Sequence, residues 1–127
     1  MSGATSRRKG SRAEVAVVHA LRRAGWDADT SRNVLEGRRT GDDIVWDGPA
    51  SIEVKDHAKL DLAGWLRQAQ DNAGDRVGVV VHKKRGTADR AEEWYVTLAF
   101  GDFLRLIGED NGAGNHAGSA EGGDGSH

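Results

Sequence analysis

The sequence predicts an α/β fold, with a central mixed β-sheet flanked by helices in the order α-β-β-β-α-β-β-α. Apolar residues recur at helical spacing over residues 11–25 and 60–74, and short runs rich in β-branched residues lie between and after these segments. The run VGVVV at residues 77–81 contains no polar position, which is typical of a strand covered on both faces. Helices are therefore expected on both sides of the sheet.

The first helix is expected over residues 11–25. Val15, Val18 and Leu21 recur at helical spacing. Ser11 can cap the start of this helix, and Gly25 can adopt the left-handed conformation that ends it. A weakly alternating strand at 26–32 and a polar loop rich in Gly and Arg at 33–42 are expected to follow.

A hairpin is expected next, because DIVW at 43–46 and SIEVK at 51–55 flank DGPA, which supplies turn residues and the one proline of the chain. A second helix is predicted over 60–74, with an apolar face made of Leu62, Trp65, Leu66 and Ala69. The remaining elements are a strand at 76–82, a basic loop at 83–93, a strand at 94–100 and a short helix that Asp102 starts.

One folded domain is expected, at residues 10–107. Residues 1–9 predict a basic flexible arm, and residues 108–127 predict a disordered acidic tail, rich in glycine and too poor in apolar side chains to order itself. The absence of cysteine excludes disulfides and thiolate zinc sites. The apolar runs are too short to span a bilayer and the first residues lack a signal-peptide pattern, so a cytoplasmic protein without membrane partners is expected.

The net charge of −2 conceals an uneven distribution, because four of the 20 acidic residues and none of the 18 basic ones lie beyond residue 108. Basic residues gather within the first 40 residues and again at Lys83, Lys84 and Arg85. Clustered cations suit a phosphate backbone, from which they release counterions. A solvated surface is the alternative interpretation.

Charged residues also interrupt the strands that are expected at the centre of the sheet. Alternation along SIEVK places Glu53 and Lys55 together on one face, opposite Ile52 and Val54. The hairpin can return Asp43 beside Glu53. Two neighbouring carboxylates repel each other unless a cation lies between them, and oxygen ligands favour Mg²⁺ or Mn²⁺ over zinc.

Each of these residues also has a purely structural explanation. Glu53 and Lys55 could decorate an exposed edge hairpin, and Asp43 could be a turn residue. Glu14 could complete a capping box with Ser11. The order of the features favours a site: an acid on the first helix, a basic loop, an aspartate that starts a strand, and a Glu-Val-Lys strand before a helix.

KGSRAE at residues 9–14, DDIV at 42–45 and IEVK at 52–55 together resemble the PD-(D/E)xK nuclease superfamily, and within it the archaeal-type and phage-encoded Holliday junction resolvases. The resemblance covers about residues 9–82 and implies the restriction-endonuclease-like fold, with residues 10–107 as the nuclease domain. It implies that Glu14, Asp43, Glu53 and Lys55 are catalytic. Glu14, Asp43, Glu53 and the carbonyl of Val54 would bind Mg²⁺, with Mn²⁺ as a substitute.

Two departures from the family pattern bear on these assignments. Asp42 stands where a proline often precedes the motif aspartate, so Asp42 and Asp43 are both candidate ligands, and Asp43 is preferred because Ile44 and Val45 follow it. Val15 replaces a basic residue after the helix glutamate, so phosphate contacts are expected elsewhere. The candidate DNA contacts are Lys9, Arg12, Arg32, Arg38, Arg39, Thr40, Gln68, Lys83, Lys84 and Arg85.

The resemblance implies a metal-dependent, structure-selective endonuclease that resolves four-way DNA junctions by paired phosphodiester hydrolysis. A junction has two-fold symmetry, which favours a homodimer, and the apolar face at residues 62–69 is a candidate interface. A nuclease of the same fold acting on other DNA in repair or replication is one alternative, and a non-catalytic DNA-binding module is another. His57 and His82 are weaker site candidates. Trp46 and Trp94 are expected to pack on the sheet, and Trp65 in the core or a subunit interface.

Overall fold

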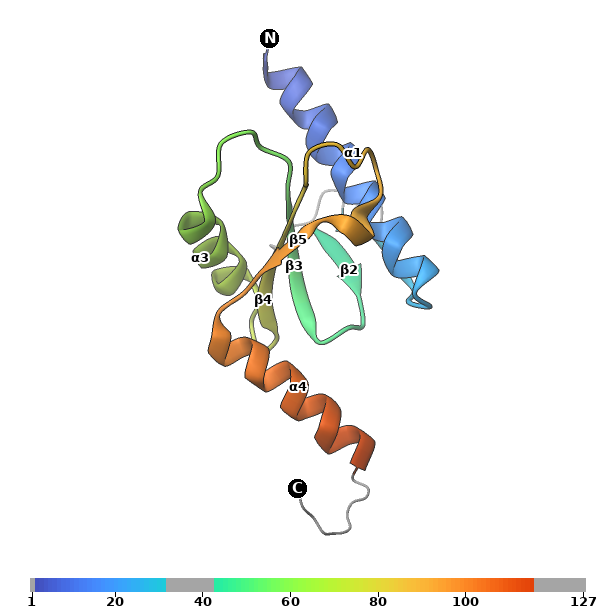
Figure 1. Ribbon diagram of the computed structural model, residues 1–127, viewed down its shortest axis with the longest axis vertical. Helices are drawn as coiled ribbons and strands as arrows, with labels where there is room; N and C mark the ends of the chain where they lie inside the picture. Colours follow the sequence, from blue (N-terminus) through green and yellow to red (C-terminus); the bar gives the residue numbers. More distant parts are fainter. Residues whose placement is uncertain (1, 32–42, 116–127) are drawn as a thin grey trace.

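The computed structural model describes the backbone of residues 2–31 and 43–115 and the side chains of residues 10–31 and 43–108. In chain order, its elements are α1 (Ser2–Arg23), β1 (Ala28–Thr30), β2 (Ile44–Trp46), β3 (Ala50–Lys55), α3 (Leu62–Asn72), β4 (Val77–His82), the 3₁₀ helix η1 (Ala91–Glu93), β5 (Tyr95–Thr97) and α4 (Phe100–Asn115). Apart from η1, this is the predicted order, so the α/β class is confirmed (Figure 1).

The strands form two small sheets. β1 pairs with β2 in an antiparallel ladder, whereas β4 pairs with β3 in parallel and with β5 in antiparallel. The three-stranded sheet is therefore mixed, as predicted, but the strands divide into two sheets where the sequence predicted one. The predicted pairing of β2 with β3 as a hairpin is wrong, because their partners are β1 and β4. The Trp46 indole closes the turn between β2 and β3. Its Nε1 donates to the Ala50 carbonyl (2.9 Å), and its ring occupies the space that a Cβ at position 48 would need, which explains the glycine there.

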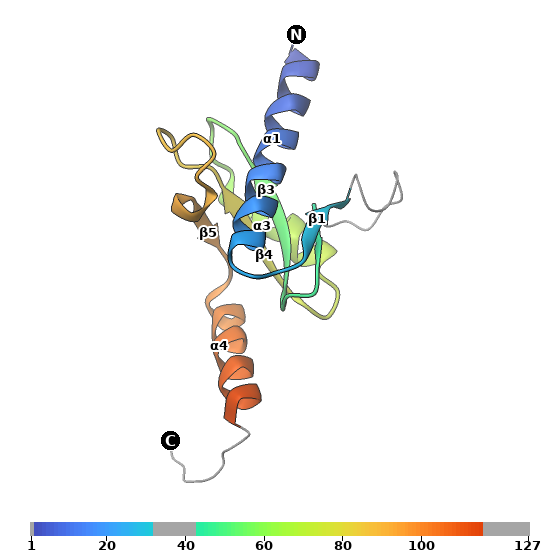
Figure 2. The same cartoon turned by 90° about the vertical axis from the view of Figure 1, so that its right-hand side faces the viewer.

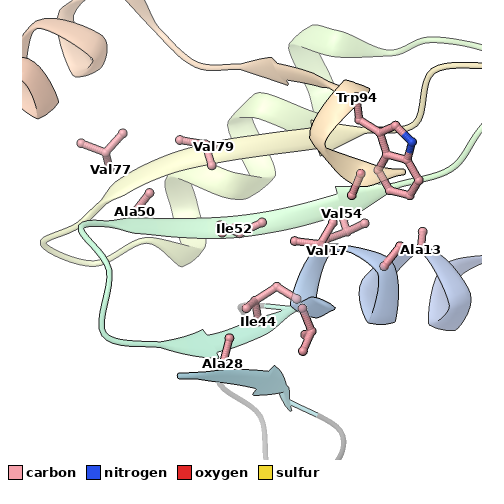
Figure 3. Close-up of a cluster of buried hydrophobic side chains, with 13 residues drawn as sticks. Ala13, Val17, Ala28, Ile44, Ala50, Ile52, Val54, Val77, Val79 and Trp94 are labelled. Atoms are coloured by element: carbon pink, nitrogen blue, oxygen red, sulfur yellow. The ribbon is translucent and has the colours of Figure 1, made fainter. Parts of the chain in front are cut away.

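Helices cover both faces of β4, which confirms the interpretation of its apolar run. On one face, Val77 and Val79 pack in a core with Ala13 and Val17 of α1 (Figure 3). On the other face, Val80 is fully buried in a second cluster with Trp65 and Ala69 of α3. The sheet thus lies between α1 and α3.

α1 starts earlier than the sequence indicates. It begins at Ser2, so the backbone of residues 2–9, expected as an arm, continues the helix, and Ser11 lies inside it rather than at its cap. The capping-box explanation of Glu14 is therefore wrong. Val15 is also 42% exposed, and the buried face is formed by Ala13, Ala16, Val17 and Val18 instead. The predicted end is confirmed, since Gly25 has a φ of +101°.

α3 has the predicted apolar face, but the chain covers part of it itself. Asp61 caps the helix by accepting a hydrogen bond from the Gly64 amide (3.2 Å). Trp65 and Ala69 are buried against β4. These two residues therefore cannot serve as the dimer surface that the sequence suggested, because the sheet of the same chain occupies that face.

α4 is longer than predicted, starting at Phe100 and running through residues 108–115. Figures 1 and 2 show it extending away from the sheet, at the end of the molecule opposite the start of α1. Phe100, Phe103, Leu104 and Ile107 follow helical spacing and are 73%, 44%, 47% and 44% exposed. Across residues 2–31 and 43–115, no helix combines the length and the apolar character needed to cross a bilayer.

Candidate functional site

β3 presents its charged residues to α3, as alternation predicts. Ile52 and Val54 lie in the core with α1, whereas Glu53 is 2% exposed on the opposite face. Asn72 Nδ2 donates to Glu53 Oε2 (3.1 Å), and Lys55 Nζ donates to Gln68 Oε1 (3.0 Å). Glu53 is therefore not decoration on an exposed edge. It is a buried carboxylate, and polar side chains of α3 hold both charged residues in place.

Asp43 is attached to the edge of β3 that faces away from β4. Its amide donates to the Ile52 carbonyl (3.2 Å), and its Oδ2 accepts a hydrogen bond from the Val54 amide (2.8 Å). The N–H and C=O groups of one strand residue point to the same side, so the Val54 carbonyl also points toward Asp43. Asp43, Glu53 and this carbonyl thus converge at one end of the strand.

A pocket of about 230 Å³ lies at this point. Glu14 of α1, Asp43, three consecutive residues of β3 (Glu53, Val54 and Lys55) and Gln68 of α3 line it. Gly10, Asp56 and His57 complete the lining. The structure therefore brings together all four residues that the sequence singled out for catalysis, from three separate parts of the chain.

The oxygen donors of this pocket suit a hard divalent cation, because they include carboxylates and a main-chain carbonyl. Mg²⁺ usually retains several waters and binds one or two protein carboxylates, a requirement that Asp43 and Glu53 meet. In the part of the chain that the structure describes, no three His, Asp or Glu side chains form a ready-made metal centre.

A second, larger pocket of about 640 Å³ adjoins the first, since Asp56 and His57 line both. Two groups of predicted DNA contacts meet here, namely Arg12 of α1 and the basic loop residues Lys83, Lys84 and Arg85. Tyr95 of β5 also lines this pocket. The Arg12 guanidinium pairs with Asp89 (3.3 Å), and both side chains are exposed, so solvent screens that pair.

The other predicted site residues are not placed. Arg32, Arg38, Arg39 and Thr40 lie outside the described residues, as does Asp42, the alternative to Asp43. Lys9 lies on α1, where only the backbone is described.

Sequence reasoning missed Asn72, the hydrogen-bond donor to Glu53. The signal that could have identified it is its spacing, because Asn72 follows Gln68 by one helical turn and shares its face.

His82 is buried rather than in either pocket, and its Nε2 lies 2.8 Å from Thr97 Oγ1. Burial lowers the pKa of His82. Of the tryptophans, Trp94 is buried in the core as expected, and Trp46 packs edge-on against Trp26.

Comparison with protein-family models gives no match for this chain, and no curated protein or solved structure matches it either. The support for a function comes from the geometry of the two pockets.

Proposed function

We propose that this chain is a Mg²⁺-dependent endodeoxyribonuclease of the PD-(D/E)xK type that cuts branched DNA in the cytoplasm, with four-way junctions as its preferred substrate. The observation that carries the proposal is the small pocket, in which Glu14, Asp43, Glu53 and Lys55 meet beside a basic pocket. Acidic residues that face a polyanion would weaken binding unless they hold a cation. Their position next to a phosphate-binding surface therefore favours catalysis over binding alone.

Each residue has a distinct role in this proposal. The carboxylates of Asp43 and Glu53 and the Val54 carbonyl would hold the metal ion, and Glu14 would contact it through water. When bound, such an ion lowers the pKa of a water molecule and offsets charge on the phosphoryl oxygens. Lys55 Nζ, oriented by Gln68 (3.0 Å), would donate to a phosphoryl oxygen or to the attacking water. The cations of the larger pocket would hold flanking phosphates.

A homodimer is part of the proposal, because the paired cuts of a two-fold junction need two sites. The exposed apolar stripe of α4, defined as Phe100, Phe103, Leu104 and Ile107, supports such an assembly. An apolar stripe of this kind on a helix is typical of a surface that another protein covers. A second copy could cover it symmetrically, with α4 packed against α4.

The test is cleavage of labelled four-way junction, linear duplex and single-stranded DNA with Mg²⁺, Mn²⁺ or EDTA. Asp43→Asn and Glu53→Gln should abolish cleavage and leave junction binding equal or tighter, because each removes a negative charge near phosphate. Glu14→Gln should melt normally and lose activity. Asp47→Asn is the matched control, since it changes an exposed aspartate that lies in neither pocket.

Three results would contradict the proposal at different levels. Near wild-type cleavage by Asp43→Asn or Glu53→Gln would remove the assigned ligands. Equal cleavage of junction and linear duplex would favour a nuclease acting on other DNA. Junction binding by the wild-type chain without cleavage in either metal would favour a non-catalytic DNA-binding module.

A further inference from the structure

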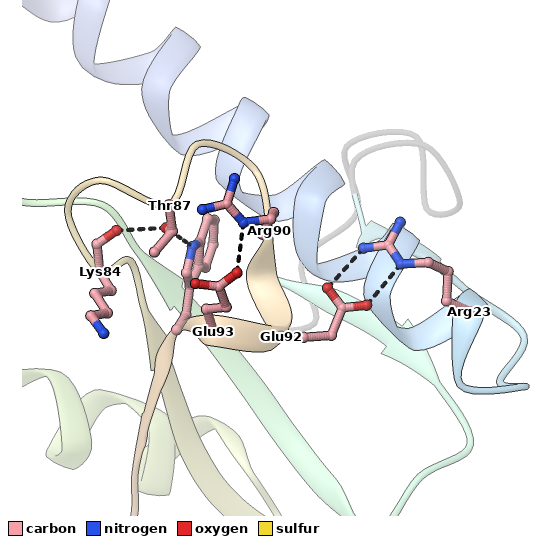
Figure 4. A network of polar contacts seen from close by, with 7 residues as sticks. Arg23, Lys84, Thr87, Arg90, Glu92 and Glu93 are labelled. Carbon is pink, nitrogen blue, oxygen red and sulfur yellow. Dashed lines mark hydrogen bonds and ion pairs between the residues drawn. The ribbon is translucent and has the colours of Figure 1, made fainter.

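The basic loop at residues 83–93 is held in a defined conformation. Trp94 Nε1 donates to Thr87 Oγ1 (2.8 Å), and Thr87 Oγ1 donates to the Lys84 carbonyl (2.6 Å), as Figure 4 shows. Thr87 and Trp94 are both buried. Ala88 has a φ of +52°, a conformation that costs free energy in residues other than glycine and that surrounding structure must enforce.

Contacts with α1 hold the other end of the loop. Arg23 of α1 donates two hydrogen bonds to the Glu92 carboxylate, at 2.7 Å and 3.0 Å (Figure 4). These bonds lower the pKa of Glu92 to about 2, so the pair stays ionised at neutral pH. The loop therefore presents its side chains from a backbone that is already ordered, which lowers the entropy cost of binding a ligand.

The loop directs three cations to the larger pocket. Lys83, Lys84 and Arg85 line it, and within residues 10–31 and 43–108 none of their charged groups has a carboxylate partner. Lys83 Nζ lies 5.7 Å from the centre of the Trp94 ring. An anion can therefore bind these groups without displacing a carboxylate of residues 10–31 or 43–108.

Aromatic rings form a row beside the same pocket. The ring centres are separated by 5.5 Å from His57 to Trp65, 5.8 Å from Trp65 to His82 and 5.4 Å from His82 to Tyr95. Both end members, His57 and Tyr95, line the larger pocket, and Tyr95 is 51% exposed. The Tyr95 ring thus packs against His82, while half of the residue remains exposed to solvent.

The strand register places this tyrosine on the catalytic side of the sheet. Lys55 lies opposite His82 on β4, and His82 lies opposite Tyr95 on β5, so the three side chains share one face. Lys55 and Tyr95 are separated by two inter-strand spacings, a backbone distance of about 10 Å. A DNA strand that contacts Lys55 through one phosphate would therefore place a neighbouring nucleotide near Tyr95.

We propose that the larger pocket binds one unpaired nucleotide of the strand that is cut, with its phosphate on Lys84 and Arg85 and its base stacked on Tyr95. Cations alone would suit any polyanion, but an exposed ring beside them fits a nucleobase. In a duplex the base faces are covered by their neighbours, so only an unpaired base can stack on a protein ring. The cavity volume lies within the usual range of ligand sites, about 300–1,000 Å³.

This inference rests on the proposed function for its DNA substrate and for the strand that is cut, and a binding experiment without metal tests the nucleotide subsite separately. Fluorescence anisotropy of the full chain in EDTA would compare a labelled oligothymidine strand with a duplex of the same length. Tyr95→Ala should weaken single-strand binding at least about fivefold and leave duplex binding within about twofold, since one base stack contributes roughly 1–3 kcal/mol. Tyr95→Phe should keep the wild-type affinity.

Matched variants make the test specific. Tyr95→Thr repeats the loss of the ring with a residue that favours strands. Val96→Ala trims the exposed residue next to Tyr95 on β5, which lines neither pocket, and should change neither affinity. Lys84→Ala and Arg85→Ala should each reduce the salt dependence of single-strand binding by about 0.7 in the log–log slope, the value for one phosphate contact. Arg67 is an exposed cation outside both pockets, so Arg67→Ala should leave the salt dependence unchanged.

Equal losses on single strand and duplex for Tyr95→Ala and Tyr95→Thr, or no loss on either, would overturn the subsite. The catalytic proposal fails separately. If the Tyr95 variants lose single-strand binding selectively but the wild-type chain never cleaves DNA, the subsite is supported and the nuclease is rejected. If the wild-type chain cleaves DNA but the Tyr95 variants bind single strands normally, the nuclease is supported and the subsite is rejected.

Discussion

The backbone of α3 packs directly on Gly78 of β4, and a methyl group there should disturb both stability and the candidate site. A Cβ at this position would lie 2.5 Å from the Ala69 carbonyl oxygen and 2.7 Å from the Gln70 nitrogen. Both are backbone atoms, so no side-chain rotation relieves the clash. Ordinary contact begins at 3.4 Å, so α3 must move by about 0.9 Å relative to the strand.

The expected cost of Gly78→Ala is that of overpacking, about 1–3 kcal/mol of unfolding free energy. For a domain of this size, each kcal/mol lowers the melting temperature by about 4–8 °C. A shift of α3 also displaces Gln68 and Asn72, whose hydrogen bonds of 3.0 Å and 3.1 Å position Lys55 and Glu53. Lengthening these bonds by most of an ångström would take them beyond hydrogen-bonding range.

Thermal unfolding followed by far-ultraviolet circular dichroism, together with urea titration, would measure the loss. Gly101→Ala on α4 is the control, since among the described residues no atom beyond its own helix backbone and chain neighbours lies within 4 Å of a Cβ there. That change should be neutral or stabilising by up to about 1 kcal/mol, because alanine favours helices over glycine. A Gly78→Ala chain that melts at or above the wild-type temperature would show that α3 does not pack this tightly on β4.

Two other predictions concern pH and assembly. Burial lowers the pKa of His82 in the folded chain below its usual 6.5, so the unfolded chain binds the extra proton and unfolding free energy should fall as pH drops below that value. Between about pH 7 and pH 5, the melting temperature of His82→Gln should change less with pH than that of wild type. His19→Gln, at an exposed position, should follow the wild-type profile. Identical pH profiles for all three chains would contradict the burial effect. In sedimentation equilibrium at micromolar concentration, the full chain should be a dimer that Phe103→Asp with Leu104→Asp converts to a monomer, because charges on the exposed stripe of α4 oppose its burial. A wild-type monomer that still makes paired junction cuts would rule the dimer out.

Features that depend on neighbouring residues could be predicted from the sequence. The order of helices and strands, the left-handed φ of Gly25 after its helix, and the opposite faces of Glu53 and Val54 all follow from local periodicity and backbone preference. The same rules failed at the start of α1, because a capping pattern at Ser11 does not prevent the helix from beginning earlier. They also failed for α4, which continues through residues 109–115 although these residues include no apolar side chain larger than that of alanine.

The sequence alone therefore determined which residues carry charge into the sheet and which face of β3 they occupy. Only the tertiary structure decided that β3 pairs with β4 rather than β2, that Glu53 is buried and bonded to Asn72, and that Tyr95 shares a face with Lys55. The physical reason is that strand pairing and helix docking depend on register between segments far apart in the chain. Local pattern limits those registers without selecting one.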